Sequence, residues 1–188
     1  AQIGCAVAGG RVFDVGPEQT LTAIGDVPWE ALHAGDTVRI HWRQEPYREK
    51  WVVCATGAAA SPVTVSGVPG PDGQLPVING QDATCRRELD FWGEDRAVIK
   101  IGGANVPADC VPVHIVIENL EIRSARPPPM FVGRDGQTAY RENAAAIWVE
   151  KGEHITIRSC RFHDCANGFV SSRQSSDLLV EQCEIYGN

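Results

Sequence analysis

The 188-residue sequence contains no apolar run near the roughly 20 residues that a helix needs to cross a bilayer. The sequence contains a single methionine, the internal Met130, so the numbered chain does not begin at a start codon. With 43% hydrophobic and 22% charged residues, the composition is that of a globular protein that can bury a core. Neither a membrane span nor intrinsic disorder is expected.

Basic residues are outnumbered by acidic ones. Lys and Arg number 17 against 24 Asp and Glu, which gives a net charge of −7 at pH 7. Nucleic acid and anionic lipid are therefore not expected as partners, because both attract basic proteins. An anionic ligand would need a local basic patch.

The seven cysteines lack the paired C-x-x-C spacing of zinc sites, so no metal site is predicted. Their scatter suits an exported protein with one or two disulfides, and the odd number leaves at least one thiol unpaired in a monomer. The opening Ala1–Gln2 resembles the product of signal-peptidase cleavage, the alternative being a chain trimmed by an experimenter. We therefore expect a secreted or periplasmic protein.

The strongest signal is an internal repeat. Residues 114–123, 154–163 and 177–186 align without gaps, with apolar residues at the second, fourth, seventh and ninth places of each copy. This alternation predicts two short strands per copy, joined by a bend at Glu118–Asn119 and at the equivalent positions. A helix would not repeat in this way.

The spacing of the copies indicates stacked coils. The second and third copies start 23 residues apart, a plausible length for one coil, whereas the first and second start 40 apart. The excess falls in a Pro- and Gly-rich stretch at about 125–142, which we expect to be a loop extruded from one coil. A third strand per coil is predicted at Ala146–Val149, which aligns with residues 169–172 at the same offset of 23 and resembles residues 98–101.

Three strands per coil predict an all-β fold, a parallel β-helix. Further β-rich runs, which would form the first coils, lie at residues 37–40, 51–54, 62–65 and 76–78. We expect residues 1–34 to hold an N-terminal segment with a short helical or irregular cap, and residues 35–188 to hold the coils. No capping element follows Ile185, so we expect a truncated solenoid on which further coils or a companion chain would stack.

Several runs resemble the N-terminal part of bacterial pectate-lyase-like β-helix proteins. They are Trp29–Ile40 with its L-x-x-G-D-T-V pattern, Pro46–Lys50 with Y-R-E, and Pro62–Gly67 with P-V-T-V-S-G. Asn119 resembles the bend asparagine of that superfamily, and Cys165–Gly168 resembles the turn that begins a new coil. The resemblance implies a secreted right-handed β-helix that binds an acidic polysaccharide and, if catalytic, cleaves it by β-elimination or epimerises it.

The chain departs from this pattern at the bend, where Ser159 and Gln182 replace asparagine, so no continuous asparagine ladder can form. It also lacks the clustered aspartates of polygalacturonases and the calcium-binding aspartate trio of pectate lyases. No cofactor is therefore evident, and Ca²⁺ has no supporting ligand cluster. The alternatives are a non-catalytic adhesin or surface scaffold, and a glycoside hydrolase, which would require paired carboxylates.

Lys151 and Arg173 are the candidate catalytic residues. Alternation places them outward on successive coils, about one interstrand spacing of ~4.8 Å apart. They resemble the Lys and Arg pair of chondroitinase B-like lyases, whose chemistry needs a base for the C5 proton and a group that neutralises the carboxylate. The competing interpretation stacks Arg173 directly over Glu150 in an exposed ion pair worth about 0.2–1 kcal/mol.

The candidate substrate-binding residues face outward as well. Trp148 is interpreted either as a platform for a sugar ring or as an ordinary aromatic under a loop, and Glu150 follows it at the end of the strand. The row formed by Arg123, His163 and Tyr186 is the other candidate, because it lacks the alternating charges of its neighbouring rows.

Other repeated positions are predicted to be structural. Two rows alternate in sign and should stabilise parallel stacking: Glu118, Arg158 and Glu181, and Glu121, Arg161 and Glu184. His114 and His154 begin equivalent strands, and we expect turn hydrogen bonds from them rather than a metal pair. Cys160 and Cys183 share the inward position of Leu120 and should stack in the core.

Overall fold

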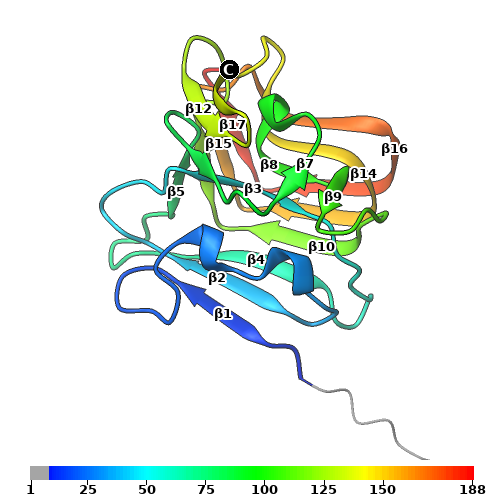
Figure 1. Ribbon diagram of the computed structural model, residues 1–188. Helices are drawn as coiled ribbons and strands as arrows, with labels where there is room; N and C mark the ends of the chain where they lie inside the picture. The colour runs from blue at the N-terminus through cyan, green and yellow to red at the C-terminus, as the bar shows by residue number, and fades with distance from the viewer. Residues whose placement is uncertain (1–8) are drawn as a thin grey trace, which may run out of the picture.

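Strands dominate residues 9–188, which are described by a computed structural model (Figure 1). The predicted cleavage product Ala1–Gln2 and the thiol of Cys5 lie outside these described residues. The strands are β1 (Val12–Val15), β2 (Thr37–His41), β3 (Glu49–Val53), β4 (Val63–Val68), β5 (Val77–Asn79), β6 (Thr84–Cys85), β7 (Asp90–Phe91), β8 (Ala97–Ile101), β9 (Ala104–Val106), β10 (Val113–Glu118), β11 (Glu121–Arg123), β12 (Met130–Gly133), β13 (Gly136–Ala139), β14 (Ala145–Arg158), β15 (Arg161–His163), β16 (Asn167–Glu181) and β17 (Glu184–Tyr186).

The strands form three faces of a solenoid, and every named pair except β7–β9 and β12–β13 is parallel (Figure 1). The first face holds β1, β2, β4, β10 and the later halves of β14 and β16. The second holds β3, β8 and the earlier halves of β14 and β16, which run on around the corner. The third holds β5, β11, β15 and β17. The predicted all-β parallel β-helix is confirmed.

Apolar side chains stack in columns inside the solenoid, because successive coils pair in register. One column on the first face contains Val65, Ile117, Ile157 and Val180. One column on the third face contains Ile78, Ile122, Phe162 and Ile185. In the three copies of the ten-residue repeat these columns hold the fourth and ninth places, so the predicted register of the repeat is confirmed. Burying such columns is the main source of stability in stacked coils.

The bends between the first and third faces have left-handed backbone. The φ angles of Asn119, Ser159 and Gln182 are 57°, 52° and 53°. A residue in this region reverses the alternation of side chains and turns the chain sharply, which is why each copy resets its pattern here. The predicted bend position is confirmed.

The predicted offset of 23 residues is wrong for the first half of β14. Ile147 pairs with Phe169 and Val149 with Ser171, an offset of 22, and the offset becomes 23 only at Lys151 and Gln174. A β-bulge between Val149 and Lys151 accounts for the change, because the later coil carries one extra residue there. The predicted residue-by-residue alignment of β14 with β16 before this corner is therefore wrong by one residue.

The Pro- and Gly-rich insertion is more ordered than the expected loop. It contains the antiparallel hairpin β12–β13, and Val132 of β12 also pairs in parallel with Thr84 of β6. The hairpin thus extends a sheet of the solenoid outward. Phe131 packs against Tyr140 at a ring separation of 4.8 Å, and both side chains are buried.

The segment that we expected to cap the solenoid contains a strand and two short helices. Strand β1 pairs with β2, and the 3₁₀-helices η1 (Ile24–Asp26) and η2 (Trp29–Ala31) follow it. Trp29 is buried and stacks on Trp51 of β3, with ring centroids 5.3 Å apart. A third 3₁₀-helix, η3, spans Glu94–Arg96. No described helix has the length and apolarity to cross a membrane.

The column residues of the last coil are more exposed than those of the coils before it. Val180 and Ile185 are 38% and 52% exposed, whereas Ile157 and Phe162 are 1% and 0% exposed. Cys160 is buried in the core as predicted, and Cys183 of the last coil is half-buried. The six cysteines of the described residues are free thiols.

Substitution of Ile117 by Asp should prevent folding or make the chain insoluble. The side chain is fully buried between neighbouring coils, and an unpaired carboxylate there costs several kcal/mol or must take up a proton. Val116→Asp is the matched control, because Val116 lies on the same strand, is only half-buried and faces outward. Thermal melts followed by circular dichroism test this, and an Ile117→Asp melt like that of wild type would contradict the register.

Candidate functional site

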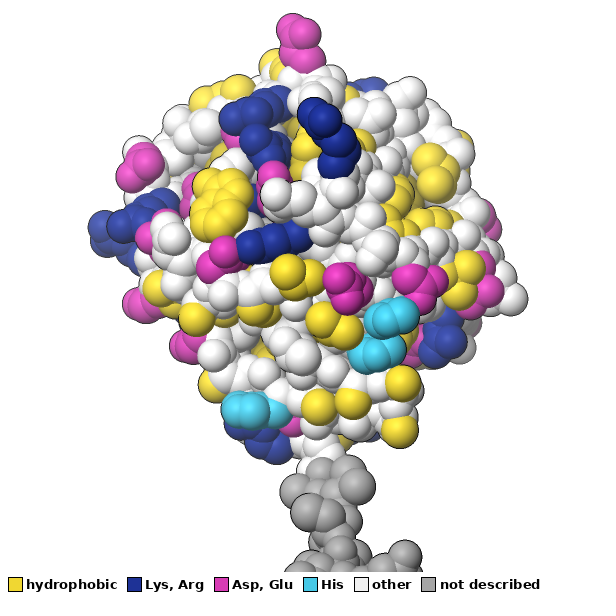
Figure 2. Space-filling view, turned by 90° about the vertical axis from the view of Figure 1, so that its right-hand side faces the viewer, with side chains coloured by type: hydrophobic (Ala, Val, Ile, Leu, Met, Phe, Trp, Pro, Cys, Tyr) yellow, Lys and Arg dark blue, Asp and Glu magenta, His cyan; other side chains and the backbone are white. Residues whose placement is uncertain are grey.

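Aromatic and charged side chains gather on the outer side of the second face. We call Trp92, Arg96, Lys100, Asp109, Trp148, Glu150 and Lys151 the aromatic–basic patch. Strands β8 and β14 place Lys100 beside Trp148, because these two residues pair in the sheet. The segment from β7 through η3 adds Trp92 and Arg96, and the Arg96 guanidinium lies 5.4 Å from the centroid of the Trp148 ring. Figure 2 shows basic, acidic and hydrophobic side chains intermixed on this side of the molecule.

Glu150 is the ionic centre of the patch. Its carboxylate accepts a hydrogen bond from Arg96 at 2.5 Å and lies 3.4 Å from the Lys100 ammonium. The predicted ion pair between Glu150 and Arg173 is therefore wrong: Glu150 pairs with Arg96 and Lys100, and Arg173 lies in the β-bulge without a ladder partner. Arg96, in the segment before β8, takes that role instead.

Lys100 is a buried cation that holds the covering segment against the sheet. It is 1% exposed and donates hydrogen bonds to the backbone carbonyls of Trp92 and Gly103. Burial lowers the pKa of Lys100 to about 8, and Glu150 opposes that shift by stabilising the charged form. The ammonium is thus enclosed by protein groups and positions the patch.

The two predicted catalytic residues have different surroundings. Lys151 Nζ donates to the Asp109 carboxylate at 2.6 Å and lies 6.0 Å from the centroid of the Trp92 ring. Arg173 is exposed at the bulge and has no ion-pair partner among residues 9–188. The ladder partner of Lys151 is Gln174. Catalytic roles for this Lys and Arg stay predictions.

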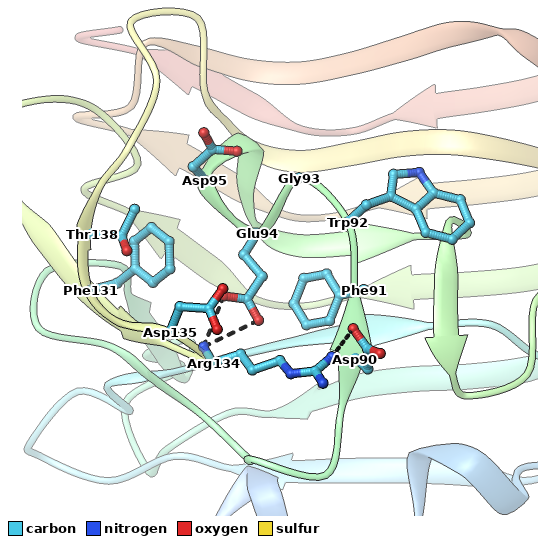
Figure 3. Close-up of a pocket in the computed structure, with 10 residues that line it drawn as sticks. All are labelled: Asp90, Phe91, Trp92, Gly93, Glu94, Asp95, Phe131, Arg134, Asp135 and Thr138. Carbon is cyan, nitrogen blue, oxygen red and sulfur yellow. Dashed lines mark hydrogen bonds and ion pairs between the residues drawn. The ribbon is translucent and has the colours of Figure 1, made fainter.

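A pocket of about 380 Å³ adjoins the patch at Trp92 (Figure 3). We call it the acidic pocket; its lining consists of Asp90, Phe91, Trp92, Gly93, Glu94, Asp95, Phe131, Arg134, Asp135 and Thr138. One wall comes from the segment before β8 and the opposite wall from the β12–β13 hairpin. Arg134, the only basic residue in the lining, forms an ion pair with Asp90 across the pocket.

Glu94 is the carboxylate of the acidic pocket whose pKa is raised, whereas the ion pair with Arg134 lowers the pKa of Asp90. Burial raises the pKa of Glu94, and the charge of Asp135 raises it further. Figure 3 places both carboxyl groups between the rings of Phe91 and Phe131. The backbone N–H of Arg134 donates to Glu94 at 3.0 Å and partly opposes the shift. A carboxyl that retains its proton to higher pH than usual can donate it to a ligand oxygen.

Sequence reasoning missed the acidic pocket because its residues lie outside the repeat. The signal available was the run Asp90–Asp95, in which carboxylates flank two aromatic residues and one glycine. Its partner wall lies in the hairpin that was expected to be a loop, more than 30 residues further along the chain. Nothing local in either segment predicts that they meet.

The other predicted binding row lies on a different face. Arg123, His163 and Tyr186 are in register on β11, β15 and β17, on the third face. The rings of His163 and Tyr186 stack at 5.0 Å, and the two ring nitrogens of His163 contact the carboxylates of Glu121 and Asp164 at 3.1 Å and 2.8 Å. This row and the aromatic–basic patch therefore do not form one site.

His114 and His154 stack face to face, with ring centroids 4.5 Å apart. His154 also hydrogen-bonds the carboxylate of Asp177 in the next coil. These residues line a groove of about 290 Å³ on the first face, and Figure 2 shows His and acidic side chains side by side there. Among residues 9–188, no group of three or more His, Cys, Asp or Glu side chains is arranged to hold a metal ion.

The row of Glu121, Arg161 and Glu184 joins three coils on their outer side as predicted, whereas in the other row the only ion pair among the described residues is that of Arg158 with Glu118. Arg158 donates to Glu118 at 2.7 Å, and Arg161 contacts both Glu121 at 3.2 Å and Glu184 at 2.9 Å. These contacts are exposed or half-buried and each contributes little by itself. They fix which residue of one coil stands beside which residue of the next.

Residues 95–188, half of the chain, match the family described as the right-handed beta helix region. Together with the parallel coils, this match shows that the chain belongs to the right-handed β-helix family. No curated protein and no solved structure matches the chain.

The Lys100→Met variant should lose part of the pH dependence of stability. Because the folded-state pKa of Lys100 is about 8 and its ordinary value is 10.5, the unfolded chain binds more protons between these pH values. Wild-type stability should therefore gain up to about 1.4 kcal/mol per pH unit from this group as pH rises through that window. Urea denaturation at several pH values between 7.5 and 10.5 tests this. An equal dependence of stability on pH in the two proteins would contradict the lowered pKa of Lys100 in the folded state.

Proposed function

We propose that this β-helix protein binds a polysaccharide along its second face, with one sugar unit in the acidic pocket and its neighbours over the aromatic–basic patch. The observation that carries the proposal is the position of Trp92. Its side chain is 42% exposed, lines the acidic pocket and lies between that pocket and the basic residues of the patch. An exposed indole flanked by hydrogen-bonding groups suits the apolar face and the hydroxyls of a sugar.

An acidic polysaccharide is the substrate class that we propose. Arg96 and Lys151 lie along the path from the acidic pocket, and each is held beside a single carboxylate, Glu150 or Asp109. These cations provide the local basic patch that an anionic ligand requires on a protein with a net charge of −7. The pocket itself is acidic, which favours a sugar unit bound there through hydroxyl groups. We further propose a location outside the cytoplasm, supported by the seven cysteines.

Hydrolysis of the glycan is a second candidate, favoured by the raised pKa of Glu94 beside Asp135. Glycoside hydrolysis requires one carboxyl that protonates the leaving oxygen and a second that acts as base or nucleophile. Glu94 would be the acid and Asp135 its partner. β-Elimination, by contrast, would use Lys151 or Arg173, and a non-catalytic adhesin or scaffold would use neither pair.

A panel of assays with different polysaccharides distinguishes these functions. The protein is incubated with pectate, alginate, chondroitin and a neutral glucan, with and without Ca²⁺. Absorbance from an unsaturated uronate indicates β-elimination, new reducing ends without that absorbance indicate hydrolysis, and binding alone indicates a lectin-like or adhesive role. Failure to bind any of the acidic polysaccharides would contradict the proposed ligand class.

Trp92→Ala should weaken polysaccharide binding by about tenfold or more, equivalent to at least about 1.4 kcal/mol, because it removes the stacking surface. Trp42→Ala is the matched control, since Trp42 lies beside Gly70 rather than at the acidic pocket. Isothermal titration calorimetry measures both. Equal affinities of the two variants would place the ligand elsewhere.

Lys151→Ala and Arg173→Ala should leave the fold nearly intact, because both side chains lie on the outer side of the coils. If the panel reveals a lyase activity, loss of that activity in either variant assigns the residue to catalysis. Activity that persists in both would make the two residues structural.

A further inference from the structure

The end of β3 and the segment that leads into β10 lie side by side, held by backbone hydrogen bonds. The N–H of Gly57 donates to the carbonyl of Val113 at 2.7 Å, and the N–H of Val113 donates to the carbonyl of Ala55 at 3.3 Å. Cys54 and Cys110 face each other across the same junction. Their separation is therefore set by main-chain pairing as well as by side-chain rotamers.

The two thiols are in direct contact. The Sγ atoms of Cys54 and Cys110 lie 3.2 Å apart, and the backbone N–H of Cys110 donates to the Cys54 sulfur at 3.3 Å. Only a small movement would bring the sulfurs to the bond length of about 2 Å. Both residues line a cavity of about 580 Å³ between the cap and the segment 107–110, which gives a small thiol reagent access to them.

Cys54 is the better nucleophile of the two. The hydrogen bonds from the Cys110 side chain and backbone lower the pKa of Cys54 to about 7, and the nearby Lys151 contributes in the same direction. The Cys54 sulfur accepts these hydrogen bonds, so its thiolate is stabilised while Cys110 keeps its proton. Attack on a disulfide requires a thiolate, and a pKa close to the ambient pH favours it.

We propose that Cys54 and Cys110 form a disulfide that fastens the segment 107–112 to the end of β3. The oxidant is a disulfide, either a small molecule or a dithiol oxidase. The Cys54 thiolate attacks one of its sulfurs, forms a mixed disulfide and releases one thiol. Cys110 then loses its proton and attacks the Cys54 sulfur, which closes the bond and releases the second thiol. Two electrons pass to the oxidant, and its two thiols account for the two protons.

The disulfide would act on the aromatic–basic patch through the neighbouring residue. Asp109 directly precedes Cys110, and its carboxylate holds Lys151 at 2.6 Å. Fixing Cys110 therefore fixes the position of Asp109 and, through it, the ammonium of Lys151. The proposal for the disulfide itself does not depend on what the patch binds.

Cys160 and Cys183 provide an internal comparison. They occupy equivalent inward positions on successive coils, so their Cα–Cβ bonds point in the same direction rather than toward each other. The two thiols also hydrogen-bond each other, which lowers the pKa of Cys183 to about 6, and each sulfur donates to a carbonyl of its own coil, at 3.3 Å to Arg158 and 3.3 Å to Glu181. A thiol of lowered pKa is thus present in both pairs, and it is the parallel direction of the Cα–Cβ bonds that leads us to expect Cys160 and Cys183 to remain reduced.

Oxidation of the native protein with glutathione disulfide, followed by alkylation and peptide mapping without reduction, tests the proposal. The expected product is one peptide pair joined through Cys54 and Cys110, with the intact mass lower by two hydrogens. Oxidised protein should also melt at a temperature higher by about 5 °C than reduced protein, because the bond closes a long loop of the unfolded chain. Cys54→Ser should abolish both effects, and Cys160→Ser should leave both in place.

Three results would overturn the proposal. They are a bond from Cys54 or Cys110 to any other cysteine, a stable glutathione adduct on Cys54 without the second step, and oxidation of Cys160 with Cys183 in preference. Disulfide mapping of the wild-type protein tests the proposed bond even if Cys54→Ser fails to fold.

Discussion

In-register stacking of inward side chains is the constraint on which the rest of the molecule depends. Each coil buries its apolar residues only if the next coil presents its own at the same height, as Ile117 and Ile157 do. A shift of one residue would turn every inward side chain outward. Bends with left-handed backbone, such as Asn119, reset the alternation of side chains between faces, so that each face presents apolar residues inward. The outer ion pairs between coils oppose a shift of one coil along the next.

Segments that do not fit the stacked coils project outward from them, and the candidate functional residues lie on these segments. The segment before β8 and the β12–β13 hairpin form the two walls of the acidic pocket, and the bulge after Val149 sets the outer arrangement at the corner. Because the scaffold beneath is rigid and repetitive, these excursions can differ in sequence without loss of the fold. Lys100 connects the solenoid with the segment before β8, since it belongs to strand β8 and donates hydrogen bonds to backbone carbonyls of the covering residues.

The sequence predicted the features that repeat and failed where a single residue or a distant partner decides the structure. The columns through Ile117 and Ile122 and the bend at Asn119 followed from alternation alone, because side-chain direction in strands has a fixed period. The one-residue bulge leaves that pattern almost unchanged, so Arg173 was wrongly stacked on Glu150. Trp148 was found on its strand, whereas Glu94 and Asp135 come together only through tertiary packing of two irregular segments.

The most direct test of the stacked register is a set of nuclear Overhauser effects between side chains of successive coils in isotope-labelled protein. We predict contacts of the Ile157 methyl groups with Val180, and of the Ile147 methyl groups with the ring of Phe169, because these pairs lie side by side in the sheet. Contacts of Ile147 with Val170 in place of Phe169 would restore a uniform offset and contradict the bulge. Absence of the contact between Ile157 and Val180 would contradict the coil stacking itself.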